Sequence, residues 1–245
     1  MPLRFGINGL GRIGRALLRI AASRPGLEPV AVNDVVPAHV LARLLARDTV
    51  HGPFPGGVGN VAAVEGRLVI GGRELPVFQE PDPARVGWGG AGAEVVVEST
   101  GRFTRRELAA AHLRDGVRTV VVSANGEGMD ATVCLGVNLG GGERDFDPAR
   151  HAVISNASCT TNCLALVAKV LHDSFGVRRA LMSTVHSYTE NQRLLDLPHP
   201  DPRRSRAAAL NMIPTSTTAA HSLGQVLPAL AGRVDGYAVR VPTPA

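Results

Sequence analysis

A glycine-rich turn between two apolar segments decides what the first part of this chain can become. Residues 3–7 predict a short strand, and Asn8-Gly-Leu-Gly-Arg-Ile-Gly-Arg15 follows with the spacing Gly-x-Gly-x-x-Gly. Apolar residues then continue at helical spacing, and a second strand over 29–32 ends at Asn33-Asp34. The order of strand, glycine turn, helix, strand and acid is typical of a Rossmann dinucleotide-binding fold.

Each residue of the turn has a chemical part in holding a dinucleotide. Gly9 permits the tight turn, Gly11 lets the backbone approach a pyrophosphate, and Gly14 lets the helix pack closely on the strand. The helix N-terminus then faces phosphate oxygens, and Asp34 can accept hydrogen bonds from an adenosine ribose. Because an acid repels a 2′-phosphate, the sequence favours NAD over NADP as the cofactor.

The alternation of strands and helices continues to residue 156 and predicts a dinucleotide-binding domain over residues 1–156. The expected elements are helices over 39–46 and 105–114, a hairpin around Gly71-Gly72, strands over 93–97, 119–122, 132–138 and 151–154, and a turn or surface excursion over 140–144. Ligands lie at the carboxyl ends of parallel strands. We therefore expect Thr100, Gly101 and Ser123 on the cofactor side.

A cysteine stands where a second domain begins. The segment Ser155-Asn-Ala-Ser-Cys-Thr-Thr-Asn-Cys163 precedes a helical pattern over 164–171, which puts Cys159 at a predicted helix start with Ser158 as its N-cap. The partial positive charge and free N–H groups of a helix N-terminus favour thiolate over thiol. Taken alone, such a cysteine is more often structural. Cys163, one turn further along, keeps that structural interpretation.

The remainder, residues 157–245, predicts part of a second, α+β domain. A strand over 180–187 carries His186, and clustered hydroxyls over 213–218 precede a helix over 219–227. A final strand over 236–241 points Arg240 away from the side of its valine neighbours. Between them lies the arginine-rich loop, residues 188–206, and a loop of this length is usually functional or packed on a partner.

Composition excludes several other classes of protein. The net charge of the 245 residues is +5, carried almost wholly by arginine, with Lys169 as the only lysine. Arginine suits phosphate, but we find no nucleic-acid motif and few aromatic residues for base stacking. Three cysteines favour a reducing cytoplasm over a disulfide scaffold, and no apolar run is long enough for a membrane span. The spacing of Cys159 and Cys163 lacks the partners of a zinc site.

Several segments together resemble phosphorylating glyceraldehyde-3-phosphate dehydrogenases. They are Asn8 to Arg15, Ser155 to Cys163, His186-Ser-Tyr-Thr189, Leu194-Leu-Asp-Leu-Pro-His199, Arg204 to Asn211 and Arg240-Val-Pro-Thr-Pro244. They occur along the whole chain, in order and with similar spacing. The resemblance implies a glycolytic, cytoplasmic oxidoreductase that uses NAD and forms a homotetramer, with the arginine-rich loop buried between subunits.

The resemblance also implies a role for individual residues. Cys159 is the nucleophile and His186 its base partner. Inorganic phosphate is bound by Ser158, Thr160, Arg204, Thr217 and Thr218, and the substrate's own phosphate by Thr189 and Arg240. NAD contacts Arg12, Ile13, Asp34 and Ser123, with Asn33 and Thr100 nearby. Leu197 and Pro198 resemble a pair that is contributed by a neighbouring subunit and helps to exclude NADP.

The implied reaction follows from these residue types. The Cys159 thiolate attacks the aldehyde of glyceraldehyde 3-phosphate to give a hemithioacetal, while His186 takes the proton. Hydride passes to the nicotinamide and leaves a thioester. Inorganic phosphate then attacks the thioester and releases 1,3-bisphosphoglycerate.

Some features depart from the family and keep alternatives open. Thr218 replaces a glycine near phosphate, and its β-branched side chain restricts the backbone there. Further departures are Pro81, Asn125, Glu190 and Asn191. The family continues past the position of Ala245, so we expect an incomplete catalytic domain, weak NAD binding and little activity. The alternatives are an erythrose 4-phosphate dehydrogenase-like activity and a non-catalytic NAD-binding remnant.

Overall fold

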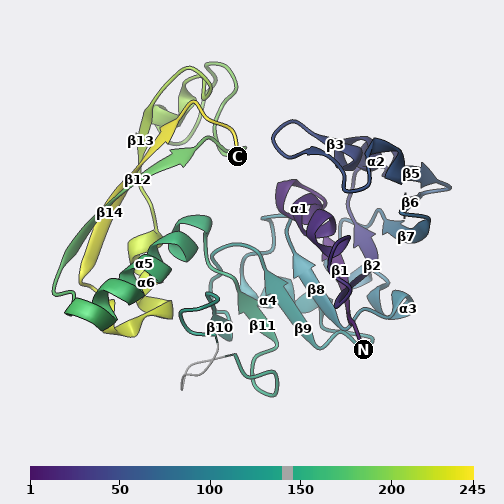
Figure 1. The fold of residues 1–245 in the computed structure, drawn as a ribbon, viewed down its shortest axis with the longest axis horizontal. Coiled ribbons are helices and arrows are strands. Elements are labelled where there is room, and N and C mark those ends of the chain that lie inside the picture. The colour runs from purple at the N-terminus through teal and green to yellow at the C-terminus, as the bar shows by residue number, and fades with distance from the viewer. Residues whose placement is uncertain (140–145) are drawn as a thin grey trace. The chain divides into compact units, whose positions relative to one another are not determined.

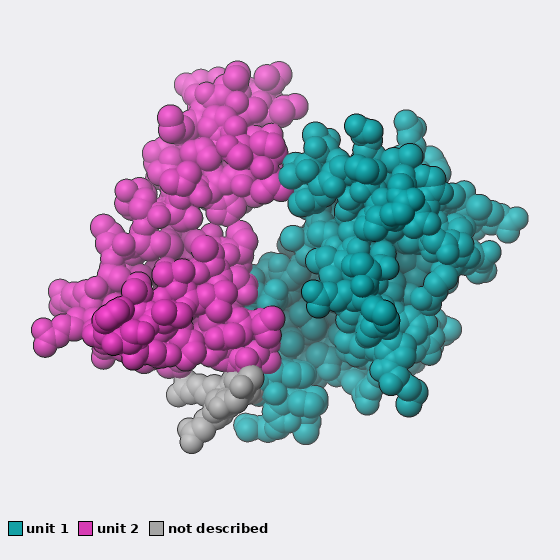
Figure 2. Space-filling model, viewed as in Figure 1, with its two compact units in different colours: residues 1–133, 144–157 teal, residues 134–143, 158–245 magenta. Residues whose placement is uncertain are grey.

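The computed structural model describes residues 1–139 and 146–245, which fall into two compact units. Unit 1 comprises Met1–Val133 and residues 146–157, and unit 2 comprises Ser158–Ala245 and the segment that begins at Cys134 (Figure 2). The units therefore divide at Ala157, and the segment after Val133 groups with unit 2 rather than with the N-terminal domain. The turn expected over 140–144 lies outside the described residues.

A nine-stranded sheet with the order β10-β11-β9-β8-β1-β2-β7-β6-β5 forms the centre of unit 1 (Figure 1). Its strands are β1 (Leu3–Asn8), β2 (Leu27–Asn33), β5 (Val61–Val64), β6 (Arg67–Ile70), β7 (Arg73–Phe78), β8 (Val95–Glu98), β9 (Thr119–Val122), β10 (Ala131–Thr132) and β11 (Val153–Ser155). The pairs from β10 to β7 are parallel, and β5 and β6 complete the edge as antiparallel strands. The strand order reverses at β1, as in a Rossmann fold.

Helices cover this sheet, and apolar clusters lie on its two faces. The helices are α1 (Arg12–Ala21), α2 (Ala38–Ala46), α3 (Trp88–Ala91) and α4 (Arg106–Ala109), and β3 (Arg47–Asp48) pairs with β4 (Gly52–Pro53) beside them. Successive strand residues face opposite sides. Val32 accordingly packs with Ile7 and Leu41, whereas Ala31 packs with Val96 and Trp88.

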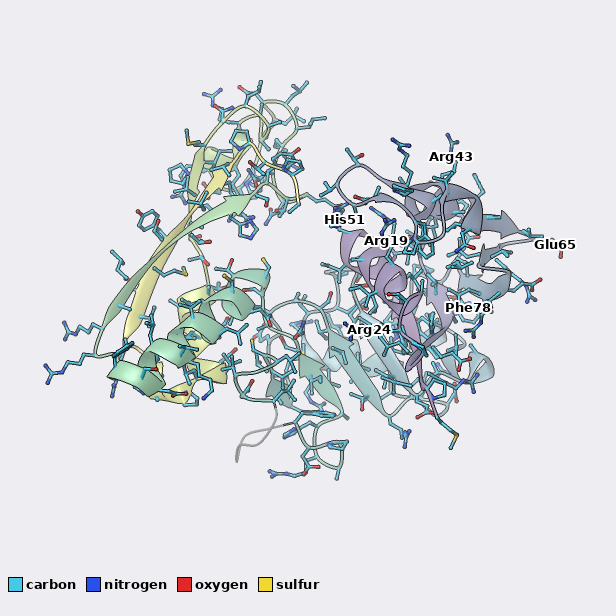
Figure 3. All side chains as sticks on the ribbon, in the orientation of Figure 1. Arg19, Arg24, Arg43, His51, Glu65 and Phe78 are labelled. Carbon is cyan, nitrogen blue, oxygen red and sulfur yellow. The ribbon has the colours of Figure 1, made fainter. Side chains whose placement is uncertain are left out.

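Turn residues set the hairpins of unit 1. Gly71 and Gly72, with φ of 58° and 79°, join β6 to β7, which confirms the predicted hairpin. A second hairpin joins β5 to β6 through Glu65 and Gly66, with φ of 47° and 76° (Figure 3). Glutamate rarely adopts a left-handed backbone conformation, so the glycine after it is the only residue in the sequence that indicates this turn.

Two elements predicted for the N-terminal domain have the wrong length. The strand expected over 132–138 is wrong beyond β10, because the Cys134 N–H donates to Asn138 Oδ1 at 2.8 Å and Gly136 turns the chain with φ of 78°. The helix expected over 105–114 ends earlier, as α4 followed by the 3₁₀ turn Ala110–His112. There His112 enters the core, fully buried, and hydrogen-bonds to side chains instead of extending the helix.

Unit 2 combines two helices with a three-stranded sheet. Its elements are α5 (Cys159–Phe175), β12 (Ala180–Ser187), the 3₁₀ turn η4 (Pro202–Ser205), β13 (Ile213–Thr215), α6 (Ala219–Val226), the 3₁₀ turn η5 (Pro228–Leu230) and β14 (Val234–Val241). β14 lies in the middle of the sheet, parallel to β12 and antiparallel to β13. The fold is α+β, as expected. In neither unit does a described helix have the length and apolar character of a membrane span.

Candidate active site

Cys159 is the first residue of α5, and the local sequence explains why the helix begins there. Ser158 adopts an extended conformation, and its hydroxyl accepts a hydrogen bond from the Thr161 N–H at 3.0 Å. Ala157 precedes it with φ of 54°, so the chain turns sharply before the helix. The N-cap position of Ser158 is confirmed, and Cys159 is exposed in the first helical turn.

His186 on β12 reaches this cysteine. Its Nε2 lies 3.1 Å from Cys159 Sγ, within hydrogen-bonding distance for a nucleophile and its base. The hydroxyl of Thr160 lies 4.0 Å from the same sulfur. A thiol, an imidazole and a hydroxyl thus meet at the start of α5.

Arg240 completes the cluster because of the strand register. Residues 186 and 240 are paired across β12 and β14, so their side chains share one face of the sheet. Arg240 Nη1 lies 2.6 Å from His186 Nδ1 and 2.9 Å from the carbonyl oxygen of Ser187. Burial of this guanidinium and repulsion from Arg204 hold the pKa of Arg240 below its usual value, against the opposing attraction of Cys159.

Arg204 is held by a residue that the sequence analysis did not single out. Its Nε and Nη2 both donate to Thr215 Oγ1 at 2.9 and 2.5 Å, and Asp201 lies 3.7 Å away. Thr215 is buried at the end of β13. Its only sequence signal was its place as the first hydroxyl of the run that ends in Thr218.

The remaining predicted phosphate residues make local contacts. Thr189 donates its N–H to Gln192 Oε1 at 3.2 Å, and the Thr217 hydroxyl accepts from the Ala219 N–H at 3.2 Å. Thr218 is the N-cap residue of α6 with φ of −91°, a value that threonine adopts without strain. The backbone at this position therefore does not require the glycine of the family. Phosphate binding by these three threonines stays a prediction.

The glycine turn of unit 1 has the shape expected of a dinucleotide cradle. Gly9 has φ of 92°, and a Cβ there would lie 2.8 Å from the Thr100 nitrogen. A Cβ on Gly14 would lie 2.2 Å from the Gly9 oxygen, so α1 packs against the turn itself. A Cβ on Gly11 would meet open space, which leaves its backbone accessible to a ligand. The residues present therefore fit a pyrophosphate at this turn.

The side chains around the turn are fixed by hydrogen bonds. The Asp34 carboxylate accepts hydrogen bonds from the Leu10 N–H at 2.7 Å and from the Val36 N–H at 3.0 Å. The Asn33 amide donates to Asn8 Oδ1 at 2.7 Å. Ile13 is half exposed on α1, and the Ser123 N–H donates to the Glu98 carbonyl at 2.9 Å. NAD binding by these residues stays a prediction.

Arg12 forms an ion pair with Asp48, a buried residue that the sequence analysis missed. Burial alone raises the pKa of Asp48, but hydrogen bonds from the His51 and Val50 N–H groups and from Arg12 outweigh it and lower the pKa to about 2. The aspartate thereby joins the start of α1 to the loop after β3. On the same helix, Arg19 donates to the carbonyl oxygens of His51 and Gly52 at 3.0 and 3.2 Å (Figure 3).

A buried polar network lies at the ends of β1 and β8, next to the glycine turn. Glu98, at the end of β8, accepts from the N–H and hydroxyl of Thr100 on one oxygen and from the Asn8 amide on the other. The Trp88 indole donates to His112 Nδ1 at 3.0 Å, so His112 is neutral and its Nε2–H donates to Glu98 at 3.2 Å. One carboxylate thus joins the ends of β1 and β8 through four donors.

Both units match known protein families. Residues 3–106 match the family description "Glyceraldehyde 3-phosphate dehydrogenase, NAD binding domain", and residues 158–245 match "Glyceraldehyde 3-phosphate dehydrogenase, C-terminal domain". The chain belongs to the glyceraldehyde 3-phosphate dehydrogenase family. The family assignment made from the sequence motifs is therefore confirmed.

Curated members of this family match along the whole chain. Glyceraldehyde-3-phosphate dehydrogenase of Geobacillus stearothermophilus is 53% identical over 244 residues, which cover 100% of this chain and 71% of the relative. Glyceraldehyde-3-phosphate dehydrogenase 1 of Bacillus subtilis strain 168 is also 53% identical over 244 residues with the same coverage. Glyceraldehyde-3-phosphate dehydrogenase 1 of Streptomyces arenae is 51% identical over 245 residues, which are 100% of this chain and 72% of that relative.

Proposed function

We propose that this chain is an NAD-dependent, phosphorylating glyceraldehyde-3-phosphate dehydrogenase that works through a thioester on Cys159. The observation that carries the proposal is the contact of 3.1 Å between Cys159 Sγ and His186 Nε2 at the N-terminus of α5, inside the matched family domain. Relatives that bear this enzyme name are about half identical to the whole chain.

The residues of unit 2 supply the covalent chemistry. The Cys159 thiolate attacks the aldehyde carbon, and the alkoxide that forms takes a proton from His186. His186 then removes that proton again as the hemithioacetal is oxidised to the thioester. NAD, when bound, accepts the hydride lost from this carbon. Attack by inorganic phosphate on the thioester expels the Cys159 thiolate and yields the acyl phosphate.

Two guanidinium groups support the proposal that the substrate is phosphorylated. Arg240 and Arg204 lie close enough for mutual repulsion, and each can bond two phosphate oxygens. We propose that Arg240 and Thr189 hold the phosphate of the substrate. Arg204, Ser158, Thr160, Thr217 and Thr218 hold the inorganic phosphate.

The first test replaces the proposed base and leaves the nucleophile in place. In His186→Asn, we expect the turnover rate for glyceraldehyde 3-phosphate to fall about 10²–10⁴-fold, because the general base is lost. Cys163→Ser is the control: it changes a side chain outside the proposed site, and we expect it to keep the rate of the wild type. A His186→Asn enzyme that turns over at the wild-type rate, with the same phosphate dependence, contradicts the proposal.

A second experiment separates the remaining alternatives. Initial rates on glyceraldehyde 3-phosphate and erythrose 4-phosphate show whether the triose is preferred, as we expect from the Leu194 to His199 segment. Calorimetric titration of the 245-residue chain with NAD accompanies these assays. NAD binding without oxidation of either aldehyde favours the non-catalytic remnant.

We also propose that the enzyme forms a homotetramer in a reducing, cytoplasmic compartment. Leu194, Leu195, Leu197 and Leu210, in and just after the arginine-rich loop, are more than half exposed in the single chain. Such a surface is typical of a subunit interface. Sedimentation equilibrium measures the assembly, and a monomer at micromolar concentration contradicts it. The three cysteines are free thiols, in keeping with a reducing environment.

A further inference from the structure

Glu98 is a buried acid whose carboxylate is surrounded by hydrogen-bond donors. The residue is 1% exposed, at the end of β8. One oxygen accepts from the Thr100 N–H at 2.8 Å and from the Thr100 hydroxyl, and the other accepts from the Asn8 amide and from His112 Nε2 at 3.2 Å. An ionised carboxylate has about four lone-pair sites, so these donors satisfy it without a proton on either oxygen.

This arrangement fixes the direction of the Thr100 hydroxyl. An ionised carboxylate cannot donate, so in the contact between Thr100 Oγ1 and Glu98 the hydroxyl supplies the proton. The Arg102 N–H donates to the same hydroxyl oxygen at 3.0 Å. The backbone N–H of Thr100 is bonded to Glu98 as well. Thr100 therefore has no proton left to donate, and its hydroxyl and carbonyl oxygens can act toward a ligand only as acceptors.

The residue before Thr100 uses its donors in the same way. The Ser99 hydroxyl donates to the carbonyl oxygen of Gly9 at 2.7 Å, and the Ser99 N–H donates to that of Asn8 at 2.8 Å. Within residues 1–139 and 146–245, no donor bonds to the carbonyl oxygens of Ser99 and Thr100. The chain that follows β8 thus spends its donors on the protein and keeps its acceptors.

The order of acceptors and donors along this edge of the sheet matches a dinucleotide. The glycine turn and the start of α1 suit a negative pyrophosphate. Asp34 follows β2 and Thr100 follows β8, on opposite sides of β1, and a Cβ on Gly9 would lie 2.8 Å from the Thr100 nitrogen. Acceptors therefore flank the pyrophosphate position on both sides, which is the arrangement that two riboses with hydroxyl donors require.

We propose that Glu98 is a positioning residue for the dinucleotide: by holding both donors of Thr100, it makes the chain after β8 select a ligand hydroxyl over a phosphate. A phosphate offers acceptor oxygens, which would face the acceptors of Thr100. The buried negative charge of Glu98 repels an anion in addition. That the hydroxyl belongs to the second ribose of NAD rests on the proposed function, whereas the preference for hydroxyl over phosphate does not.

Calorimetric titration of the 245-residue chain with ADP, ADP-ribose and ATP, without magnesium, tests this preference. The ligands share adenosine and two phosphates, and differ in whether nothing, a ribose or a phosphate follows. We expect ADP-ribose to bind about 3–10-fold more tightly than ADP, and ATP no more tightly than ADP. Charge alone favours the opposite order, because ATP is the most negative ligand and the chain carries +5. Binding in that opposite order overturns the proposal.

Matched variants test whether Glu98 acts through Thr100. Thr100→Val removes the hydroxyl and should weaken ADP-ribose binding about 3–10-fold without changing the affinity for ADP, and Thr100→Ser should restore the wild-type value. Glu98→Gln should weaken ADP-ribose binding by a similar factor, since an amide nitrogen facing Thr100 would reverse its hydroxyl. The exposed Glu107→Gln is the control and should keep all three affinities.

The double variant Glu98→Gln/Thr100→Val separates positioning from a general loss of structure. Its loss of ADP-ribose affinity should equal that of either single variant, because each change removes the same contact. Losses that add up, or equal losses for ADP and ADP-ribose, contradict the proposal. If Glu98→Gln does not fold, the Thr100 variants and the three ligands still decide. No titration uses an aldehyde or a hydride transfer, so a failure of the proposed dehydrogenase activity is seen separately.

Discussion

At the scale of single residues, Asp48 makes the clearest stabilising contribution outside the active site. It accepts hydrogen bonds from the Val50 and His51 N–H groups at 2.9 and 3.0 Å and pairs with Arg12. Its pKa of about 2 lies below the value of about 3.9 in an unfolded chain. A depressed pKa means that the folded state favours the carboxylate, so the stability it adds is present above pH 4 and is lost as the pH falls through about 2.

Asp48→Asn should therefore lower the free energy of unfolding by about 1–3 kcal/mol near neutral pH, since charged hydrogen bonds are lost. The difference from wild type should shrink as the pH falls from about 4 toward about 2. Urea unfolding at several pH values measures it. Glu74→Gln is the control, because the pair of Glu74 with Arg67 is exposed and contributes little. An Asp48→Asn effect that grows in acid contradicts this interpretation.

Local patterns in the sequence identified residues whose role depends on their neighbours in the chain. The roles of His186 and Arg240, which depend on strand register, were named only through the family resemblance. Cys159 and its N-cap Ser158 follow from a local pattern of hydroxyl residues before a helix. The contact of Arg240 with His186 requires the pairing of β12 with β14, between residues 54 positions apart. Thr215 and Asp48 likewise contact arginines that tertiary structure brings to them, and a single sequence does not indicate those contacts.

At the scale of elements, the start of α5 connects helix stability with the position of the thiol. The Ser158 hydroxyl occupies the N-cap of this 17-residue helix. Ser158→Ala should lower the free energy of unfolding by about 0.5–2 kcal/mol, because the Thr161 N–H loses its acceptor. Ser174→Ala, an exposed serine in the last turn, should change it little. Thermal unfolding monitored by circular dichroism compares the two, and equal effects would contradict the capping role.

Predicted strands and helices were most accurate where one period governs a whole segment. The strand expected over 180–187 coincides with β12, and the helix over 219–227 is α6 to within one residue. The strand over 132–138 was wrong because an asparagine side chain and a left-handed glycine override an apolar run. Such side chain to backbone bonds compete with sheet formation and leave no periodic trace.

The buried carboxylate of Glu98 holds the ends of two neighbouring strands, β1 and β8, together. Glu98→Gln replaces one acceptor oxygen by an amide nitrogen, which then faces N–H or O–H donors. We expect unit 1 to lose about 1–3 kcal/mol in its free energy of unfolding, since buried donors become unsatisfied. The exposed Glu107→Gln should leave it within about 0.5 kcal/mol. Urea titration decides, and an unchanged midpoint for Glu98→Gln contradicts the role of the network.

At the scale of the whole molecule, the two units carry different parts of the proposed reaction. The matched NAD binding domain lies in unit 1, and the thiol, the imidazole and both arginines lie in unit 2. A ligand that binds one folded unit stabilises that unit by an amount set by its concentration relative to its Kd, about 2.7 kcal/mol at a hundredfold excess. NAD should therefore raise the unfolding midpoint of unit 1 directly, and that of unit 2 only as far as the two unfold together.

The buried Trp88 gives the molecule a built-in optical reporter. It is the chain's single tryptophan and lies in unit 1, whereas both tyrosines, Tyr188 and Tyr237, belong to unit 2. Tryptophan emission therefore follows unit 1, and tyrosine absorbance follows unit 2, in one unlabelled sample. The Trp88 indole donates to His112, which in turn donates to the Glu98 carboxylate. That carboxylate also accepts from Thr100, so the emission of Trp88 should respond to changes at Thr100. Dinucleotide binding at the glycine turn should therefore change the wavelength and the intensity of Trp88 emission.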